Sequence, residues 1–151
     1  MEPQIRFCTS ADGTRIAYAT FGDRNLPPLV AFNGWGHMIE GFNTLSWGRR
    51  FVEVPLKHRY IVEFDRRGTG GSQREAADLS LGAQVADLVA VVDAVGLEQF
   101  ELIGWFDGCA VALSFAADYP DRVSRLVLAS PFAASSDTWM GTGADQTAQL
   151  I

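Results

Sequence analysis

The sequence has little cysteine and little histidine, and it has no long apolar run. Its 151 residues include only two cysteines, Cys8 and Cys109, which lie far apart and without metal-ligand spacing around them. The N-terminus lacks the basic and then apolar segments of a secretory signal peptide. These absences argue against a disulfide framework, a metal site or a cofactor, and they predict a reducing, cytoplasmic setting.

Charge and hydropathy restrict the partners further. Twelve basic and eighteen acidic residues leave a net charge of −6, and neither sign is concentrated in a long run. A nucleic-acid backbone would be repelled on average, so nucleic acid is not an expected partner. Charges or glycines interrupt every apolar stretch well before it reaches the length of a membrane span, so no membrane partner is expected either.

The chain does have enough apolar residues for one compact domain, since 48% of its residues are hydrophobic. Asp12-Gly13 predicts a tight turn between two strands at 4–10 and 15–21. Strand-like and helix-like runs then alternate. We predict strands at 29–32, 60–64, 100–103 and 123–129, and helices at 46–56, 81–95 and 108–118.

This alternation predicts an α/β fold with a mostly parallel, doubly wound sheet and an N-terminal β-hairpin. The predicted core covers residues 1–134, and residues 135–151 form a C-terminal tail without an assignment. The clearest helix follows Ser80 and ends before Gly96, a residue that commonly closes helices. Its apolar residues recur at steps of four and three, at Leu81, Val85, Leu88, Val92 and Val95.

One segment lies where a strand, a tight turn and a helix meet, Gly104-Trp105-Phe106-Asp107-Gly108. In a nucleophile elbow this context presents a catalytic serine at the central position. Phe106 occupies that position, and a benzyl group cannot attack a carbonyl. Both histidines, His37 and His58, precede the segment, whereas a nucleophile elbow of this kind is followed by its histidine. The sequence therefore supplies neither the nucleophile nor the base at the expected place.

Four ordered motifs between Ile5 and Pro131 together resemble the α/β-hydrolase fold family. Asn33-Gly34-Trp35-Gly36-His37 is similar to the loop that supplies one oxyanion-hole amide, and 65–72 is similar to the turn after the fourth strand. The elbow follows, and 119–123 is similar to the junction after the elbow helix. The resemblance implies the first six strands of a usual eight, as in hydrolase-like domains found alone or joined to bacterial regulatory and nucleotide-cyclase proteins.

The resemblance also implies the composition of a site. Backbone amides of Trp35 and Asp107 would form its oxyanion-like part. The Asp107 carboxylate would oppose an anionic intermediate there unless it points away or is protonated. The residues expected to line the pocket are Gly34, Trp35, His37, Trp105 and Phe106.

Three side chains could still take part in catalysis, and each also has a non-catalytic interpretation. Asp107 could be a displaced carboxylate nucleophile, or else a solvated or helix-capping carboxylate. Cys109 could be a thiol activated near a helix N-terminus, or a buried packing residue. His37 could be a general base, or it could brace its loop by hydrogen bonding. For the charged and glycine-rich turn at 65–72, the favoured interpretation is structural rather than ligand-binding.

The sequence favours a catalytically degenerate α/β-hydrolase-like domain that binds a small apolar ligand or a protein partner. The alternative is an ester or acyl hydrolase with an unusual or residual site, and a gene fragment without a selected function is a third possibility. The strand at 123–129 would leave an open sheet edge, which is prone to pair with another chain. A homodimer through this edge is expected, unless residues 135–151 fold over it.

Overall fold

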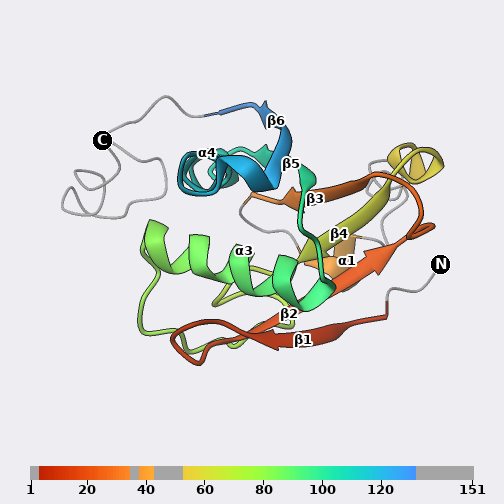
Figure 1. Ribbon diagram of the computed structural model, residues 1–151. Coiled ribbons are helices and arrows are strands. Elements are labelled where there is room, and N and C mark those ends of the chain that lie inside the picture. Colours follow the sequence, from red (N-terminus) through yellow and green to blue (C-terminus); the bar gives the residue numbers. More distant parts are fainter. Residues whose placement is uncertain (1–3, 35–37, 43–52, 132–151) are drawn as a thin grey trace.

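The computed structural model describes residues 4–34, 38–42 and 53–131 (Figure 1). Their six strands form one sheet in the order β1-β2-β4-β3-β5-β6. The β1–β2 and β2–β4 pairs are antiparallel and the other three pairs are parallel, which confirms the predicted α/β class and the N-terminal hairpin. The strands are β1 (Arg6–Thr9), β2 (Arg15–Phe21), β3 (Pro28–Phe32), β4 (Tyr60–Phe64), β5 (Phe100–Trp105) and β6 (Val123–Ala129).

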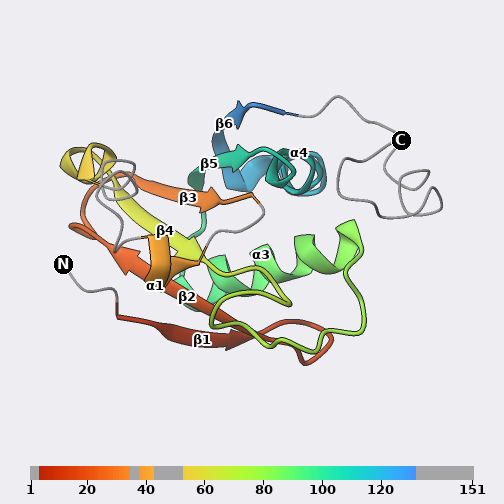
Figure 2. The ribbon, with the colours of Figure 1, turned by 180° about the vertical axis from the view of Figure 1, so that it is seen from behind.

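Two long helices cover one face of this sheet. They lie side by side, α3 over the β1–β2 end and α4 over β3, β5 and β6 (Figures 1 and 2). The described helices and 3-10 turns are α1 (Ile39–Phe42), η1 (Pro55–Lys57), α3 (Leu81–Val95), α4 (Gly108–Asp118) and η2 (Pro120–Arg122).

Side chains alternate across β4, so the strand contributes to two apolar clusters on opposite faces. Val62 and Phe64 pack in the main core with residues of α3 and α4, and the Phe64 ring meets Phe32 edge to face at 5.1 Å. Ile61 points the other way and packs with Ile39 of α1 and the half-buried Leu56 of η1. Apolar residues therefore cover the central strands on both faces.

Capping residues account for the ends of α3. The Ser80 hydroxyl accepts a hydrogen bond from the Ala83 amide at 3.3 Å, which satisfies one free donor of the first turn. Gly96 closes the helix in the left-handed conformation with φ 75°. Between them the predicted stripe is buried from Val85 to Val95, and it includes one buried charged residue that the periodicity did not predict, Asp87.

Some predicted boundaries differ from the structure. β5 continues two residues beyond the predicted end, to Trp105, because β6 pairs with it along that whole length. β1 is shorter than predicted, and the helix α1 was not predicted at all. Most of the helix expected at 46–56 lies outside the described residues, and its end is a 3-10 turn that begins at Pro55.

Candidate functional site

The elbow connects β5 to α4 through a left-handed residue. Phe106 has φ 51°, a conformation that is unusual for a bulky side chain and that commonly marks functional turns. Its amide donates to the Ala129 carbonyl of β6 at 3.0 Å, and its carbonyl accepts from the Cys109 amide at 3.1 Å. Phe106 is 50% exposed. The turn therefore presents an aromatic ring at the carboxyl end of the parallel strands.

Two glycines allow this turn to form. A Cβ atom at Gly104 would lie 2.8 Å from the Cys109 Cα, and one at Gly108 would lie 2.7 Å from the Phe32 carbonyl oxygen. Both distances are too short for a side chain, so α4 can approach β5 and β3 this closely only with glycine at these positions. The elbow keeps the close packing of a strand-turn-helix although its central residue is phenylalanine.

Asp107 occupies the N-cap position of α4 but does not cap it. Its backbone is helical, with φ −66° and ψ −23°, and its side chain makes no capping hydrogen bond. Of the two non-catalytic alternatives for Asp107, a solvated or a helix-capping carboxylate, the capping one is therefore wrong. The carboxylate instead forms an ion pair with the Arg66 guanidinium, which comes from the loop after β4.

Two further contacts hold Arg66 in this position. The Gln84 side-chain oxygen of α3 accepts hydrogen bonds from two guanidinium nitrogens, one of them at 3.0 Å. The guanidinium carbon also lies 5.6 Å from the centre of the Phe32 ring. This cation balances the Asp107 charge beside the elbow. No local sequence pattern predicts the contact, because 41 residues separate its two partners.

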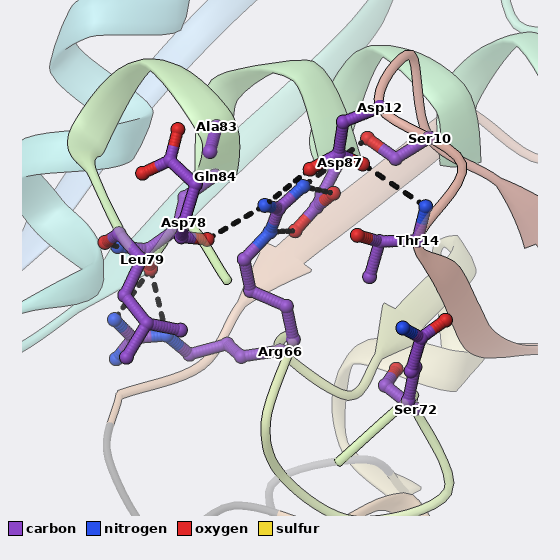
Figure 3. Close-up of polar contacts among 12 residues, drawn as sticks. Ser10, Asp12, Thr14, Arg66, Ser72, Asp78, Leu79, Ala83, Gln84 and Asp87 are labelled. Atoms are coloured by element: carbon purple, nitrogen blue, oxygen red, sulfur yellow. Dashed lines mark hydrogen bonds and ion pairs between the residues drawn. The ribbon is translucent and has the colours of Figure 1, made fainter. Parts of the chain in front are cut away.

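The neighbouring Arg67 is buried in a second network that fastens the same loop. Two guanidinium nitrogens bond the Asp87 carboxylate at 2.7 Å each, and another bonds Asp12 at 2.8 Å. That same nitrogen also donates to the Asp78 carbonyl at 2.7 Å. Figure 3 shows how Asp12 from the first hairpin and Asp87 from α3 converge on one guanidinium. These contacts support the structural interpretation of the charged turn.

Asp65, at the end of β4, links that turn to α1. One carboxylate oxygen accepts from the Ile39 amide at 2.8 Å and the other from the Gly71 amide at 2.7 Å. Burial raises the pKa of Asp65 above its ordinary value, and these two amides oppose that rise. The Ser72 hydroxyl donates to the Asp65 carbonyl at 2.6 Å and accepts from the Ala17 amide at 2.9 Å. The glycine-rich turn is thus bonded internally and to β2.

Gly34, which follows β3, lies beside the elbow. A Cβ atom there would be 3.0 Å from the Trp105 carbonyl oxygen and 3.1 Å from the Phe106 Cβ. The structure therefore brings Gly34, Trp105 and Phe106 together, with Trp105 partly buried and Phe106 exposed. The other predicted lining residues, Trp35 and His37, lie outside the described residues, as does the predicted amide of Trp35.

Cys109 is buried in the first turn of α4. Its thiol lies 3.1 Å from the Gly104 carbonyl oxygen and 3.5 Å from that of Ala129. Burial raises the pKa of the thiol, so the nucleophilic thiolate is disfavoured. This geometry matches the packing interpretation of Cys109.

The described surface also has open hollows away from the elbow. One is lined by Arg15 and residues 70–75, and another lies beside Gly96 and Arg122. Among the described residues, no group of three or more histidine, cysteine, aspartate or glutamate side chains could hold a metal ion. The described helices also include none with the length and apolar character of a membrane span.

The comparisons with known proteins agree with this geometry. A model of the alpha/beta hydrolase fold family matches residues 27–150. The chain therefore belongs to the α/β-hydrolase fold family, as its motifs indicated.

Individual relatives within this family include named enzymes. A pyrrolizixenacetamide deacetylase from Xenorhabdus hominickii is 28% identical over 90% of this chain and 44% of its own length. A non-heme chloroperoxidase from Streptomyces lividans is 32% identical over 86% of this chain and 47% of its own length. The crystal structure of a hydrolase from Pseudomonas aeruginosa PA01 superposes with a TM-score of 0.77 at 25% identity, over 87% of this chain and 48% of that one. The chain thus spans about half the length of these relatives.

Proposed function

We propose that this chain is a catalytically degenerate α/β-hydrolase-like domain that binds a small apolar ligand at the elbow. The observation that carries the proposal is Phe106, a half-exposed aromatic side chain held at the apex of a strand-turn-helix by a left-handed backbone. An apolar ring at this point offers contact area to a ligand but no electron pair for acyl transfer.

The side chains near the apex support a binding role in different ways. Asp107 is paired with Arg66, so an attack by its carboxylate would first have to break that ion pair. Cys109 is buried, with the pKa of its thiol raised. Neither group is both accessible and activated in the way that covalent catalysis requires of a nucleophile.

The setting of the elbow suits an apolar molecule. Ligand sites in open α/β sheets lie beyond the carboxyl ends of the parallel strands, where Gly34, Trp105 and Phe106 meet. The pairing of Arg66 with Asp107 balances the local charge, so neither ion alone would select a charged ligand. We further propose that the protein works in a reducing, cytoplasmic compartment, which suits the free thiols of Cys8 and Cys109.

A second candidate function is an ester or acyl hydrolase with an unusual site. Two observations favour it: the glycine-supported geometry of the elbow is intact, and relatives named above are hydrolases. The amide of Asp107 follows the elbow apex, where a family member would provide one oxyanion donor. This function would need a nucleophile other than the side chain at the apex.

A binding experiment with a matched control tests the first proposal. Apolar ligands would be screened by thermal shift and calorimetry against the unmodified protein, Phe106→Ala and Phe7→Ala. Phe7 is 49% exposed, almost the same as Phe106, but it lies on β1 at the far edge of the sheet. We expect a ligand whose affinity falls about tenfold or more in Phe106→Ala alone, since burying an aromatic ring contributes about 1.5–3 kcal/mol. Equal losses in both variants would contradict binding at the elbow.

An ester panel separates the two candidate functions. The unmodified protein should give no turnover above a heat-inactivated sample, and turnover would establish the hydrolase instead. Phe106→Ser is the informative variant, because it restores a hydroxyl to the apex. If a protein partner rather than a small molecule binds the elbow, the ligand screen will give no shift while a pull-down loses its partner in Phe106→Ala only.

A further inference from the structure

An ion pair borders the aromatic ring of the elbow and links two loops. One carboxylate oxygen of Asp107, Oδ2, bonds the Arg66 guanidinium, which comes from the loop after β4. The other oxygen, Oδ1, lies 3.0 Å from the point that a Cβ atom at Gly34 would occupy, and the same point is 3.1 Å from the Phe106 Cβ. The carboxylate therefore lies between Arg66 and the loop after β3, next to the base of the Phe106 side chain.

Contacts that do not depend on Asp107 also hold Arg66 in place. The Gln84 side-chain oxygen accepts from two guanidinium nitrogens, and the Gln84 side-chain nitrogen donates to the Leu79 carbonyl at 2.9 Å. The amide of Gln84 is thereby oriented with its oxygen towards the guanidinium, which also lies 5.6 Å from the centre of the Phe32 ring. Arginine keeps its charge in proteins. The cation should therefore stay beside the elbow when the Asp107 carboxylate is removed.

The pair determines how a charged ligand would be received at the elbow. An anionic ligand would meet the Asp107 carboxylate and would have to compete with it for Arg66. A cationic ligand would meet Arg66 and would have to compete with it for Asp107. Either ligand would lose hydration on entering an apolar site without gaining an unpaired counter-ion, whereas an uncharged ligand avoids this cost. Specificity of this kind arises from the rejection of the wrong ligand as well as from contacts to the right one.

We propose that Arg66 and Asp107 are specificity-determining residues, which make the elbow select uncharged apolar ligands and reject carboxylates and amines of the same shape. The inference rests on the proposed binding function and names the class of ligand that this site takes. Each ion cancels the attraction that the other would exert on a ligand, so the selectivity requires both. Loss of Asp107 alone leaves a cation that attracts carboxylates, and loss of Arg66 alone leaves a carboxylate that attracts amines.

Three probes that share one aromatic ring and differ in charge test the inference. They are naphthaleneacetamide, naphthaleneacetate and naphthaleneethylamine, which are neutral, anionic and cationic at about pH 7. Calorimetry measures their dissociation constants for the wild type, Asp107→Asn, Arg66→Gln and the double variant. The wild type should bind the acetamide most tightly. Asp107→Asn should bind the acetate about tenfold more tightly than the wild type does, and Arg66→Gln should do the same for the amine, because hydrogen bonds to charged groups are the stronger ones. The double variant should return to the preference of the wild type.

Asp93→Asn is the matched control. Asp93 and Arg122 form an ion pair in which the side chains are 57% and 23% exposed, compared with 40% and 21% for Asp107 and Arg66. Arg122 likewise has a second acceptor, the Leu97 carbonyl at 2.8 Å. This pair lies just before β6 begins, at the opposite end of the parallel strands from the elbow. Removal of the Asp93 charge should therefore leave the affinity for all three probes unchanged.

The outcomes separate this inference from the proposed binding function. If the acetamide binds the wild type and Phe106→Ala weakens it, but neither charged probe gains affinity in its variant, the inference is overturned and the binding function stands. If none of these proteins binds the acetamide, the binding function fails for this class of ligand and the inference fails with it. A gain for the acetate in Asp93→Asn as large as in Asp107→Asn would also overturn the inference, since the effect would then come from the net charge of the protein. Asparagine keeps the shape of the aspartate side chain, and circular dichroism checks that every variant is folded.

Discussion

Two adjacent arginines, Arg66 and Arg67, lie in two regions of the molecule, the elbow and the turn after β4. Their ion pairs differ in burial. Arg67 fastens the turn after β4, where its side chain is 1% exposed and that of Asp87 is 2% exposed. Arg66 reaches the elbow, where its side chain is 21% exposed and its partner Asp107 is more exposed still. The turn is closed by buried, bidentate bonding, whereas the elbow pair lies near the surface beside a half-exposed ring. The buried bonds of Arg67 restrict the turn after β4, whereas the side chains at the elbow are exposed enough to contact another molecule.

The largest expected effect tests the rigid region. Asp87→Ala leaves the Arg67 guanidinium buried without its bidentate partner, and it should lower the free energy of unfolding by about 3–5 kcal/mol. Urea denaturation measures this. Asp107→Ala removes the carboxylate from the more exposed pair and should cost far less. Equal losses in the two variants would remove the distinction between the regions.

The next effect tests the backbone that supports the elbow. Gly104→Ala forces a methyl group against Cys109 and Ala112 and should destabilise the protein by about 1–3 kcal/mol. Gly82→Ala is the control, since that glycine lies in α3 with open space around it. There alanine should stabilise the helix by about 1 kcal/mol. If Gly104→Ala leaves the free energy of unfolding unchanged in urea denaturation, the packing between β5 and α4 at Gly104 is less tight than the Cβ distances indicate.

A smaller effect tests strain at the apex. Phe106→Gly and Phe106→Ala both remove the ring, but only alanine keeps a Cβ atom in the left-handed conformation. Glycine should therefore be the more stable variant by about 1 kcal/mol, the reverse of the usual order of these residues in a helix. Thermal denaturation compares them directly. If alanine is as stable as glycine, the strain at the apex is absent.

The smallest effect concerns the pH dependence of the turn. The Thr14 amide, and after it Arg67, hold the pKa of Asp12 at about 2, below its ordinary 3.8. A carboxyl with a lowered pKa in the folded state stabilises the protein above the unfolded value and loses that contribution as the pH falls towards the folded value. The stability difference between the wild type and Asp12→Asn should therefore shrink between pH 4 and pH 2. Glu98→Gln serves as the control for the loss of one exposed charge, and a difference that stays constant with pH would contradict the assignment.

Much of the fold could be predicted because local patterns control it. The Asp12-Gly13 turn, the β-branched and aromatic residues of β4 and the stripe of α3 each depend on residues close in the chain. The end of β5 at Trp105 was missed because its pairing partner comes from β6, more than twenty residues later. The one-turn helix α1 was missed because so short a segment carries too little periodicity to identify.

At the elbow, too, the local features could be predicted from the sequence and the long-range contacts could not. Its position and its unusual apex residue could be read from Gly104 to Gly108, because the spacing of the glycines is itself the steric requirement of the turn. The pairing of Asp107 with Arg66 could not be predicted, and of the two non-catalytic alternatives for Asp107 the helix-capping one was wrong. The Asp107 carboxylate forms an ion pair with Arg66, a residue far away in the sequence, and makes no capping hydrogen bond in its own helix.

The sequence by itself therefore determined the family, the order of the elements and the absence of a hydroxyl or thiol at the apex of the elbow, since all three depend on residue identity and local spacing. Only the tertiary structure decided which arginine meets which carboxylate, that Cys109 is buried, and that β5 pairs with β6 as far as Trp105. The physical reason is distance along the chain. Charge pairing, burial and strand order arise when segments far apart in the sequence pack together, and no local pattern encodes them.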